Sequence, residues 1–549
     1  MTKDSLKIPG FMQQIISTEP RQIDQANFTN SFVEELRGEV GLDKRSRPVP
    51  GYCYSRVEPT PVRDPRLIAW SDDLAAFLGL TQPAERGAAV DVLAGNLITP
   101  TMKPFAARYG GHQFGSWAGQ LGDGRAISLG EIEAYDGSYW EIQLKGAGPT
   151  PYSRRADGRA VLRSSLREFL CSEAMYYLGV PTTRALSLVG TGDTVVRDMF
   201  YSGDPRPEPG AIVARVAPTF IRFGNFELMT ASGETENLRA LADYVIRHHY
   251  PELGEPSEEA YLAWFEEICR RTAVMLAHWM SVGFVHGVMN TDNMSILGIT
   301  IDYGPYGWLE PYDPDWTPNT TDFGYRRYAF GQQPRVALWN LMMLARALSP
   351  LVPNIEDFSR GLERYRSTLL ETQHEMMLRK LGLTSMAGES DELLIEDLPQ
   401  NMADSEIDMT LFFRHLSHMS ADLISNCESE ELLFGSLIQM TSYANPGGQG
   451  DEGLLQWLHR YAQRLRKEPC SVKSIRERML SANPKYVLRN YLAQKAIDGA
   501  EAGDLSFLQT LMSALKTPYA EQPEHDDLSA KRPDWARDKP GCATLSCSS

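Results

Sequence analysis

One short segment, lying between helical stretches, constrains the fold of this chain more than any other feature. It starts with HGVMNTDN, from His286 to Asn293, continues through the apolar run MSILGITI, and ends in the turn Asp302-Tyr-Gly304. Apolar residues recur with a helical period over residues 261–282 before it, and helical patterns dominate the chain after it. A strand-and-loop segment in this position indicates a functional loop within a helical domain.

Asn293 and Asp302 have the order of two metal-binding residues of protein kinases. Kinases place an Asn at the end of the catalytic loop and an Asp in a later Asp-aromatic-Gly turn, where both bind the ions that bridge the ATP phosphates. The spacing from His286 to Asn293 matches that loop. Because amide and carboxylate oxygens suit Mg²⁺, we predict that Asn293 and Asp302 hold this ion.

Val288 departs from the kinase pattern at the position of the catalytic base. The kinase loop has an Asp two residues after its His, and this chain has a valine there. A valine can neither accept a proton nor orient a hydroxyl group. Asp292 is the nearest carboxylate that could act as the base, so we predict it as the catalytic residue.

A Gly-rich zone upstream predicts the β-rich part of such a fold. Residues 126–132 and 139–146 alternate apolar and polar side chains, and Asp136-Gly137 between them is a strong hairpin signal. Lys145 lies at the end of the second predicted strand. The next helix, predicted over residues 161–179 from its apolar stripe, carries Glu168 beside that stripe.

Lys145 and Glu168 can each be interpreted in two ways. In a kinase small lobe, a strand lysine pairs with a glutamate of the following helix and faces the nucleotide phosphates. A single strand lysine is otherwise a solvated residue, and Glu168 could pair on the surface with Arg163 or Arg167. The Gly-rich turn and the hairpin that precede them favour the ion pair Lys145–Glu168.

Four further residues have the chemistry of phosphate contacts. Gly122 and Gly124 free the backbone to approach a ligand closely, although a simple hairpin turn explains them as well. The guanidinium groups of Arg215 and Arg222 are suited to bidentate contact with phosphate, and structural salt bridges are the alternative.

These patterns predict an α+β, protein-kinase-like fold with two lobes, a β-rich N-lobe and a helical C-lobe, followed by a helical C-terminal extension. The predicted parts are an N-terminal extension that packs on the small lobe, the N-lobe, the C-lobe with the catalytic loop and metal site, a helical C-terminal region, and a flexible tail with a terminal Cys. They cover residues 1–100, 101–236, 237–350, 351–515 and 516–549.

Charge and composition exclude several classes of function. The 54 Lys and Arg against 71 Asp and Glu give a net charge of −17, which disfavours general binding to nucleic acid. The apolar runs are shorter than the ~20 residues that span a bilayer, so we expect no membrane contact. The N-terminal sequence has neither a signal nor a transit pattern, and we expect a cytoplasmic monomer. The seven Cys are scattered without metal-ligand spacing.

Four long stretches resemble the selenoprotein O family. They are YGGHQFGSWAGQLGDGRA at 109–126, EIQLKGAGPTPYSRRADGRAVLRSSLREFL at 141–170, ARVAPTFIRFGNFE at 214–227 and HGVMNTDNMSILGITIDYGP at 286–305. Ile142 stands where the family motif has a leucine. The similarity runs over about residues 100–340 and is less distinctive toward both ends.

The resemblance implies a protein-kinase-like fold that binds ATP in an inverted orientation and transfers AMP to Ser, Thr or Tyr hydroxyls of proteins. Transfer of UMP, from UTP, is also ascribed to bacterial members. By motif, Asp292 would be the acid/base residue, and Asn293 and Asp302 would hold Mg²⁺ or Mn²⁺. The implied nucleotide contacts are Gly122, Gly124, Arg125, Lys145, Asp157, Gly158, Arg215, Arg222 and Asp302. The pair Asp157-Gly158 also fits a turn that approaches the next helix.

An inverted nucleotide places its α-phosphate near the acceptor, and attack there expels pyrophosphate. Arg215 and Arg222 could stabilise the charge of that leaving group. The leading hypothesis is therefore a protein nucleotidyltransferase that acts on protein substrates. Two alternatives remain: a catalytically inactive ATP-binding pseudokinase scaffold, and a protein kinase.

Cys547, followed by two serines, matches the near-terminal Sec or Cys of the family. The resemblance implies an accessible thiol that could be redox-active, and an idle exposed cysteine is the alternative. Some bacterial relatives carry a cysteine in the loop that corresponds to residues 315–322, and this chain has none there. Cys542 or a thiol of another protein remains as a candidate partner.

Overall fold

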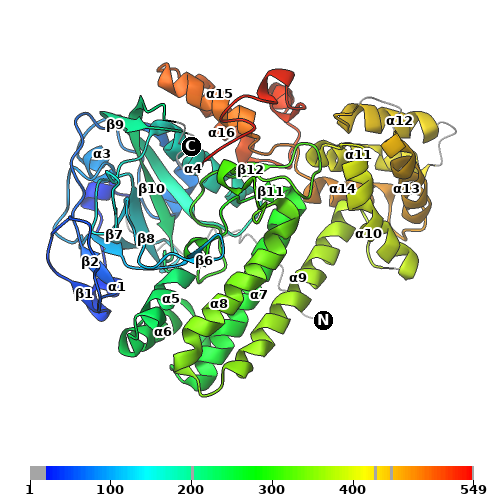
Figure 1. The fold of residues 1–549 in the computed structure, drawn as a ribbon. Coiled ribbons are helices and arrows are strands. Elements are labelled where there is room, and N and C mark those ends of the chain that lie inside the picture. The colour runs from blue at the N-terminus through cyan, green and yellow to red at the C-terminus, as the bar shows by residue number, and fades with distance from the viewer. Residues whose placement is uncertain (1–19, 200–202, 387, 426–429, 445–448, 547–549) are drawn as a thin grey trace.

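The computed structural model describes residues 20–199, 203–386, 388–425, 430–444 and 449–546. It confirms the α+β class: a β-rich lobe is followed by a helical lobe and then by further helices (Figure 1). Three short helices belong to the N-terminal part, α1 (Ser31–Glu35), α2 (Asp72–Phe77) and α3 (Ala88–Leu93).

An eight-stranded sheet forms the β-rich lobe, with the strand order β1-β2-β4-β7-β8-β10-β9-β3. Neighbouring strands are antiparallel except β1 and β2, which are parallel. The strands are β1 (Gly38–Glu39), β2 (Tyr54–Arg56), β3 (Arg66–Trp70), β4 (Phe105–Ala107), β7 (Ala126–Glu133), β8 (Tyr139–Lys145), β9 (Arg184–Arg197) and β10 (Arg206–Ala217).

The predicted hairpin is confirmed as β7 and β8, which place Ala126 opposite Lys145. Gly137 in its turn has a φ of 81°, in the left-handed region that favours glycine. The sequence patterns did not predict β9 or the three strands before residue 100. The first six residues of β9 are all buried, so this strand lacks the polar alternation that marks a half-exposed strand.

The first hundred residues contribute to the sheet itself, because β2 pairs with β4 and β3 pairs with β9, while β1 extends the sheet beside β2. They therefore do more than cover the small lobe from outside. The division of the chain at residue 100 stays a prediction.

α4 (Leu162–Tyr177) packs on β9 and β10 (Figure 1). Its apolar stripe of Leu166, Phe169 and Leu170 is buried, which confirms the helix that the sequence predicts. Glu168 lies within this stripe and is carried into the interior with it. The sequence pattern thus positions a carboxylate under the sheet.

The helical lobe consists of α5 (Phe223–Ala231), α6 (Thr235–His249), α7 (Glu258–Val282), α8 (Gln333–Leu348) and α9 (Ser359–Lys380). α7, α8 and α9 pack side by side below the sheet in the view of Figure 1. Two small sheets complete the lobe region: β5 (His112–Gln113) pairs with β6 (Ser116–Trp117), and β11 (Phe284–Val285) pairs with β12 (Gly307–Trp308).

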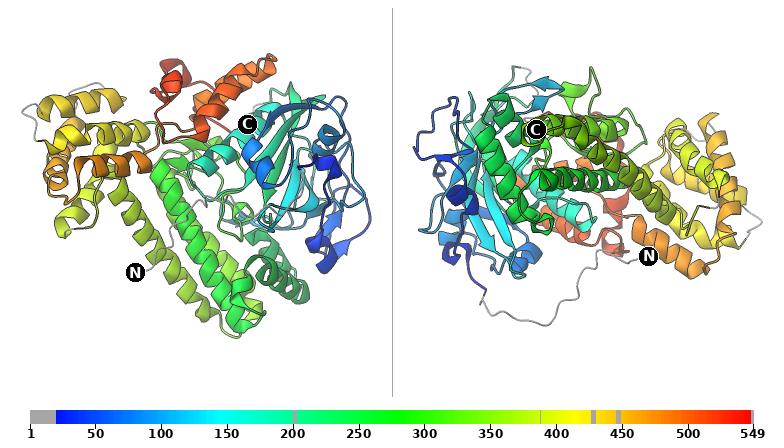
Figure 2. Two further views of the ribbon diagram at one scale, coloured as in Figure 1. Left: turned by 180° about the vertical axis from the view of Figure 1, so that it is seen from behind. Right: turned by 90° about the horizontal axis from the view of Figure 1, so that it is seen from below.

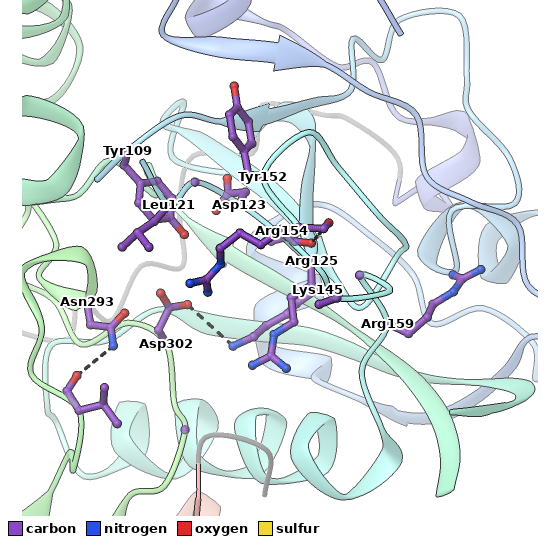
Figure 3. A pocket seen from close by; sticks show the side chains of 18 of the residues that line it. Tyr109, Leu121, Asp123, Arg125, Lys145, Tyr152, Arg154, Arg159, Asn293 and Asp302 are labelled. Atoms are coloured by element: carbon purple, nitrogen blue, oxygen red, sulfur yellow. Dashed lines mark hydrogen bonds and ion pairs between the residues drawn. The ribbon is translucent and has the colours of Figure 1, made fainter. Parts of the chain in front are cut away.

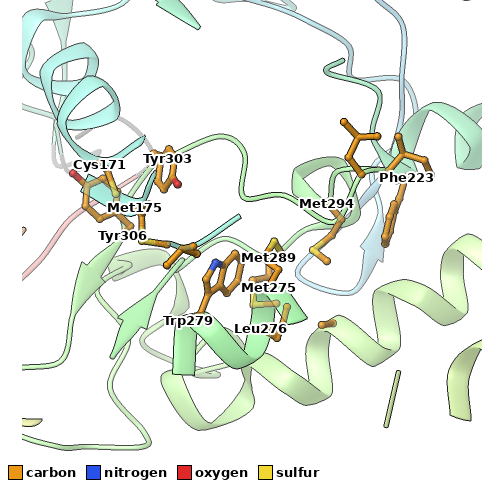
Figure 4. Close-up of a cluster of buried hydrophobic side chains, with 14 of the residues drawn as sticks. Cys171, Met175, Phe223, Met275, Leu276, Trp279, Met289, Met294, Tyr303 and Tyr306 are labelled. Atoms are coloured by element: carbon orange, nitrogen blue, oxygen red, sulfur yellow. The ribbon is translucent and has the colours of Figure 1, made fainter. Parts of the chain in front are cut away.

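The loop that begins at His286 is anchored on a buried aromatic cluster (Figure 4). Trp279 of α7 stacks on His286 with ring centroids 5.4 Å apart, and its indole N–H donates to the Thr300 hydroxyl at 2.8 Å. Tyr306 donates its hydroxyl to the carbonyl oxygen of Arg167 in α4 at 2.8 Å. The loop is therefore held by both α7 and α4.

The helices after α9 form two groups (Figure 2). α10 to α14 build a bundle around a hydrophobic cluster separate from that of the sheet, and both ribbon figures show it at the end away from the sheet. α15 and α16 return to pack on α4. The bounds are α10 (Glu389–Asp404), α11 (Met409–Ile424), α12 (Glu430–Thr441), α13 (Gln449–Leu465), α14 (Val472–Ala482), α15 (Asn490–Glu501) and α16 (Ser506–Lys516). None of the helices in the described ranges is long and apolar enough to cross a membrane.

Residues 516–546 pack against the rest of the chain, which differs from the flexible tail that composition predicts. Leu528 and Leu545 are buried there. The backbone of Leu545 accepts a hydrogen bond from Thr320 and donates one to Pro318. Single apolar residues in a polar segment form no periodic pattern, so the sequence could not reveal their burial.

A buried ion pair between Asp408 and Arg489 joins the α10–α14 bundle to the start of α15. The two carboxylate oxygens of Asp408 accept from the Arg489 guanidinium at 2.8 and 3.0 Å. The same carboxylate accepts from the backbone N–H of Leu411 at 3.1 Å and so caps α11. The pair therefore serves both as a cap and as a link.

We expect Asp408→Ala to lower the free energy of unfolding by about 3–5 kcal/mol, because it removes the hydrogen-bonded counter-ion of a buried guanidinium and leaves only the more distant Glu310 carboxylate at 3.9 Å. Thermal and urea denaturation measure this loss. Asp404→Ala, at an exposed position of α10, is the matched control and should change stability by less than about 0.5 kcal/mol. Equal effects of the two substitutions would contradict the assigned role of the pair.

Candidate active site

A cavity of about 540 Å³ lies between the sheet and the helical lobe (Figure 3). Its lining includes Gly122, Gly124, Arg125, Lys145, Gly158, Arg215, Val288, Asn293 and Asp302. Four other predicted residues, Asp157, Glu168, Arg222 and Asp292, do not line it, but each adjoins a residue that does. The fold thus gathers residues that the sequence spreads over two lobes.

The ion pair Lys145–Glu168 that the sequence predicts is present. The ammonium of Lys145 at the end of β8 lies 2.5 Å from the carboxylate of Glu168 in α4, and the side chains are only 11% and 4% exposed. Arg215 of β10 donates to the second oxygen of Glu168 at 3.0 Å. This burial excludes the alternatives of a solvated strand lysine and a surface glutamate.

Asp302 is the most heavily paired carboxylate of the site. Arg215 and Arg222 both donate to it, and the Lys145 ammonium lies 3.8 Å away (Figure 3). Burial alone would raise the pKa of Asp302, but Arg222, Arg215 and Lys145 hold that pKa well below its usual range. Its φ of 57° is in the left-handed region, which is uncommon for a residue other than glycine. Arg215 and Arg222 thus form salt bridges within the protein, which is the second of the two roles that their sequence pattern allows.

Gly124 and Gly158 line the cavity, whereas Asp157 lies beside it. The Asp157 carboxylate is about half exposed and pairs at 2.6 Å with Arg197, which is itself a lining residue. Gly158 has a φ of 71°, and a side chain there would clash with the backbone of Gly148. A Cβ on Gly124 would lie 2.9 Å from the Tyr152 carbonyl oxygen. The two glycines are therefore needed for close packing of the loops around the cavity.

Asp292 lies in a short 3₁₀ turn, Thr291–Asn293, and is buried. Its Oδ2 accepts from the side-chain amide of Gln113 at 3.3 Å, and within the described residues its Oδ1 has no hydrogen-bond partner. Burial raises the pKa of Asp292 to about 7, and the bond from Gln113 opposes this rise. A carboxyl group with such a pKa can exchange a proton near neutral pH.

The β5–β6 hairpin covers this aspartate, and the sequence patterns did not predict its role. A Cβ on Gly111 would lie 2.7 Å from Asp292 Oδ1, so only glycine fits there. The backbone N–H of His112 donates to the Thr291 hydroxyl at 2.7 Å, and the His112 ring lies 2.8 Å from Glu227. The glycines at 110, 111 and 115 were the available signal, because they mark a stretch of close backbone approach.

The sequence predicts a redox-active thiol at Cys547, with Cys542 as a candidate partner. Cys547 lies outside the described residues. Cys542 is buried, and burial raises the pKa of its thiol to about 11, so it is a poor thiolate in this structure.

Comparisons with known proteins identify the family of this chain. The model of the family described as "Protein adenylyltransferase SelO" matches residues 45–516. A relative from Nitrosospira multiformis, named "Protein nucleotidyltransferase YdiU", is 53% identical over 97% of this chain and 98% of its own length. A protein of the same name from Xanthomonas axonopodis pv. citri is 56% identical over 95% of this chain and 99% of its own length.

Among solved structures, ROP2 from Toxoplasma gondii, described as a virulence factor with a protein-kinase fold and no enzymatic activity, matches 50% of this chain and 81% of its own. Its identity of 14% and TM-score of 0.22 are too low to support a conclusion. The family match and the two relatives each cover most of the sequence. This chain therefore belongs to the SelO family of protein adenylyltransferases.

Proposed function

We propose that this protein transfers AMP from ATP to Ser, Thr or Tyr hydroxyls of other proteins and releases pyrophosphate. The observation that carries the proposal is the position of the carboxylate beside the cavity, which differs from that of a kinase. Val288 occupies the wall where a kinase has its base, and a buried carboxylate, Asp292, immediately precedes Asn293. The family description and the names of the relatives support a nucleotidyl transfer.

The charge of the cavity favours a polyphosphate ligand. Six cationic residues line it, Arg125, Lys145, Arg154, Arg159, Arg197 and Arg215 (Figure 3). Only Asp123 and Asp302 oppose them among the lining residues. A concentration of positive charge in a chain with a net charge of −17 supports binding of a nucleoside triphosphate at this place.

Asn293 and Asp302 fit a divalent cation by the chemistry of their donor groups. The amide nitrogen of Asn293 donates to the Val288 carbonyl at 2.9 Å, so its amide oxygen is the group that would face an ion. Each oxygen of Asp302 accepts from one arginine and keeps a further lone pair for an ion, which fits a cation that takes few protein ligands. Asn293 and Asp302 would hold Mg²⁺ or Mn²⁺, which when bound neutralises phosphate charge.

The transfer step follows from these positions. The acceptor hydroxyl oxygen forms a bond to the α-phosphorus, the bond from that phosphorus to the bridging oxygen breaks, and pyrophosphate leaves. Asp292 accepts the hydroxyl proton, and Gln113 keeps its carboxylate in place. Lys145, Arg215 and Arg222 supply the positive charge that stabilises the departing phosphates.

The alternatives differ in what is transferred to the acceptor protein. UTP in place of ATP would give UMP transfer by the same step, a protein kinase would transfer the γ-phosphate, and an inactive scaffold would bind a nucleotide without any transfer. The cytoplasmic location and the monomeric state stay predictions from the sequence.

We expect α-labelled ATP to label acceptor proteins in the presence of Mg²⁺ or Mn²⁺, and γ-labelled ATP to leave them unlabelled. Autoradiography of a bacterial lysate incubated with the purified protein measures both. α-Labelled UTP in a parallel reaction decides between the nucleotides. Label from the γ position alone would favour a kinase, and no label from any nucleotide would favour the scaffold.

Asp292→Asn should lower the transfer rate by about 10²–10⁴-fold, because an amide cannot accept the proton. Nucleotide binding, measured by calorimetry, should persist since Asp292 does not line the cavity. Asp315→Asn, the same change at an exposed position, is the matched control. A wild-type rate in Asp292→Asn would remove this residue from the mechanism.

Gly111→Ala should lower the transfer rate by about 10²-fold, because the added methyl group displaces the Asp292 carboxylate or the hairpin that covers it. Gly324→Ala is the control, since a Cβ there meets nothing within 4 Å. Both variants are assayed with saturating nucleotide. Similar rates for the two variants would mean that the hairpin does not position Asp292.

A further inference from the structure

A second cavity, of about 290 Å³, is lined by residues of helices α7, α9, α10 and α11 and lies outside the active site. Figure 1 shows the four helices. This volume is at the lower end of sites that hold small molecules. Five methionines contribute to its wall, Met280, Met376, Met377, Met402 and Met409. Methionine side chains adapt their shape to an apolar ligand, which makes such a wall suitable for a flexible chain.

Lys380, the last residue of α9, is the charged group of this wall. It is 3% exposed, and among the described residues no group forms an ion pair or hydrogen bond with its ammonium. Its one polar contact is the ring of Phe413, whose centroid lies 4.2 Å from Nζ. Phe413 lines the cavity as well, so the ammonium and its ring partner lie at the same wall.

A buried amine without a counter-ion is physically unfavourable. Burial lowers the pKa of Lys380 to about 7, and no neighbouring charge contributes to the shift. The face of one aromatic ring compensates only part of the cost of removing an ammonium group from water. The other titratable groups of the wall, His374 and Tyr312, carry no negative charge at neutral pH. An anion in the cavity would supply the charge that the protonated amine lacks.

The shape of the cavity indicates what else the anion carries. Leu370 is 55% exposed and lines the same cavity as Lys380, and both lie on α9. Ten residues of helix separate them, which corresponds to about 15 Å. The cavity therefore extends from an exposed apolar residue to a buried cation.

We propose that this cavity binds a linear alkyl carboxylate, with the alkyl chain along α9 and the carboxylate paired with the Lys380 ammonium. Burial of the chain against the methionines supplies the apolar contribution. The charge-assisted hydrogen bond supplies the selectivity for an anion. The inference does not depend on the transfer reaction, because this site is separate from the nucleotide cavity.

The test compares three ligands of equal chain length on the full-length protein. Calorimetry and thermal unfolding are followed with decanoate, decanol and decyltrimethylammonium, each below its micelle concentration. Decanoate should bind about tenfold more tightly than decanol, as expected from a hydrogen bond to a charged group. Decyltrimethylammonium should not bind. No binding of decanoate, or equal binding of decanoate and decanol, would overturn the proposal.

Lys380→Met supplies the second arm of the test. Methionine keeps the apolar volume and removes an unpaired buried charge, so the variant should fold with undiminished stability. It should bind decanoate about tenfold more weakly and no longer distinguish it from decanol. Lys473→Met makes the same change where the lysine is 86% exposed and should match the wild type. Undiminished decanoate binding by Lys380→Met would also overturn the proposal.

Discussion

The carboxylate of Asp302 is the point on which the arrangement of the two lobes depends. It accepts from Arg215 of β10 and from Arg222, the residue before α5, while Lys145 of β8 lies 3.8 Å away. Glu168 of α4 joins the same network through Lys145 and Arg215. Two carboxylates and three cations from five separate segments therefore form one buried network, with one positive charge in excess. Since removing one partner of a buried pair leaves an uncompensated charge, each segment fixes the position of the others.

The same physical rule gives opposite conclusions at the two buried lysines. The charge of Lys145 is paired with Glu168, which offsets part of its desolvation, although burial still lowers the pKa of Lys145. Lys380 has an aromatic ring but no acid, and its surroundings are a methionine-lined cavity. Buried charges that are paired define the architecture of this molecule, while one that is unpaired indicates where something else binds.

Local patterns in the sequence predicted the elements that carry the site, and contacts between distant segments were beyond them. The hairpin β7–β8, the helix α4 and the pair Lys145–Glu168 follow from alternation, helical period and the order of motifs. Gln113 was missed because its contact with Asp292 joins residues 179 positions apart. Lys380 is the last residue of a helix, a position where an exposed lysine commonly interacts favourably with the helix dipole. The local sequence therefore contains no signal that this lysine is buried. The first six residues of β9 are all buried and show no alternation, which hid that strand.

The packing of residues 516–546 has a consequence for the order in which the molecule is assembled during synthesis. The loop after Asp302 is hydrogen-bonded at Pro318 and Thr320 to Leu545, a residue that the ribosome adds long after the catalytic loop. The sheet and the cavity lining can form early, since their strands end at Ala217 and the last lining residue is Pro305. The backbone partner of the loop is synthesised only later, so a nascent chain can hold a nearly complete cavity lining beside a loop that still lacks its hydrogen bonds to Leu545.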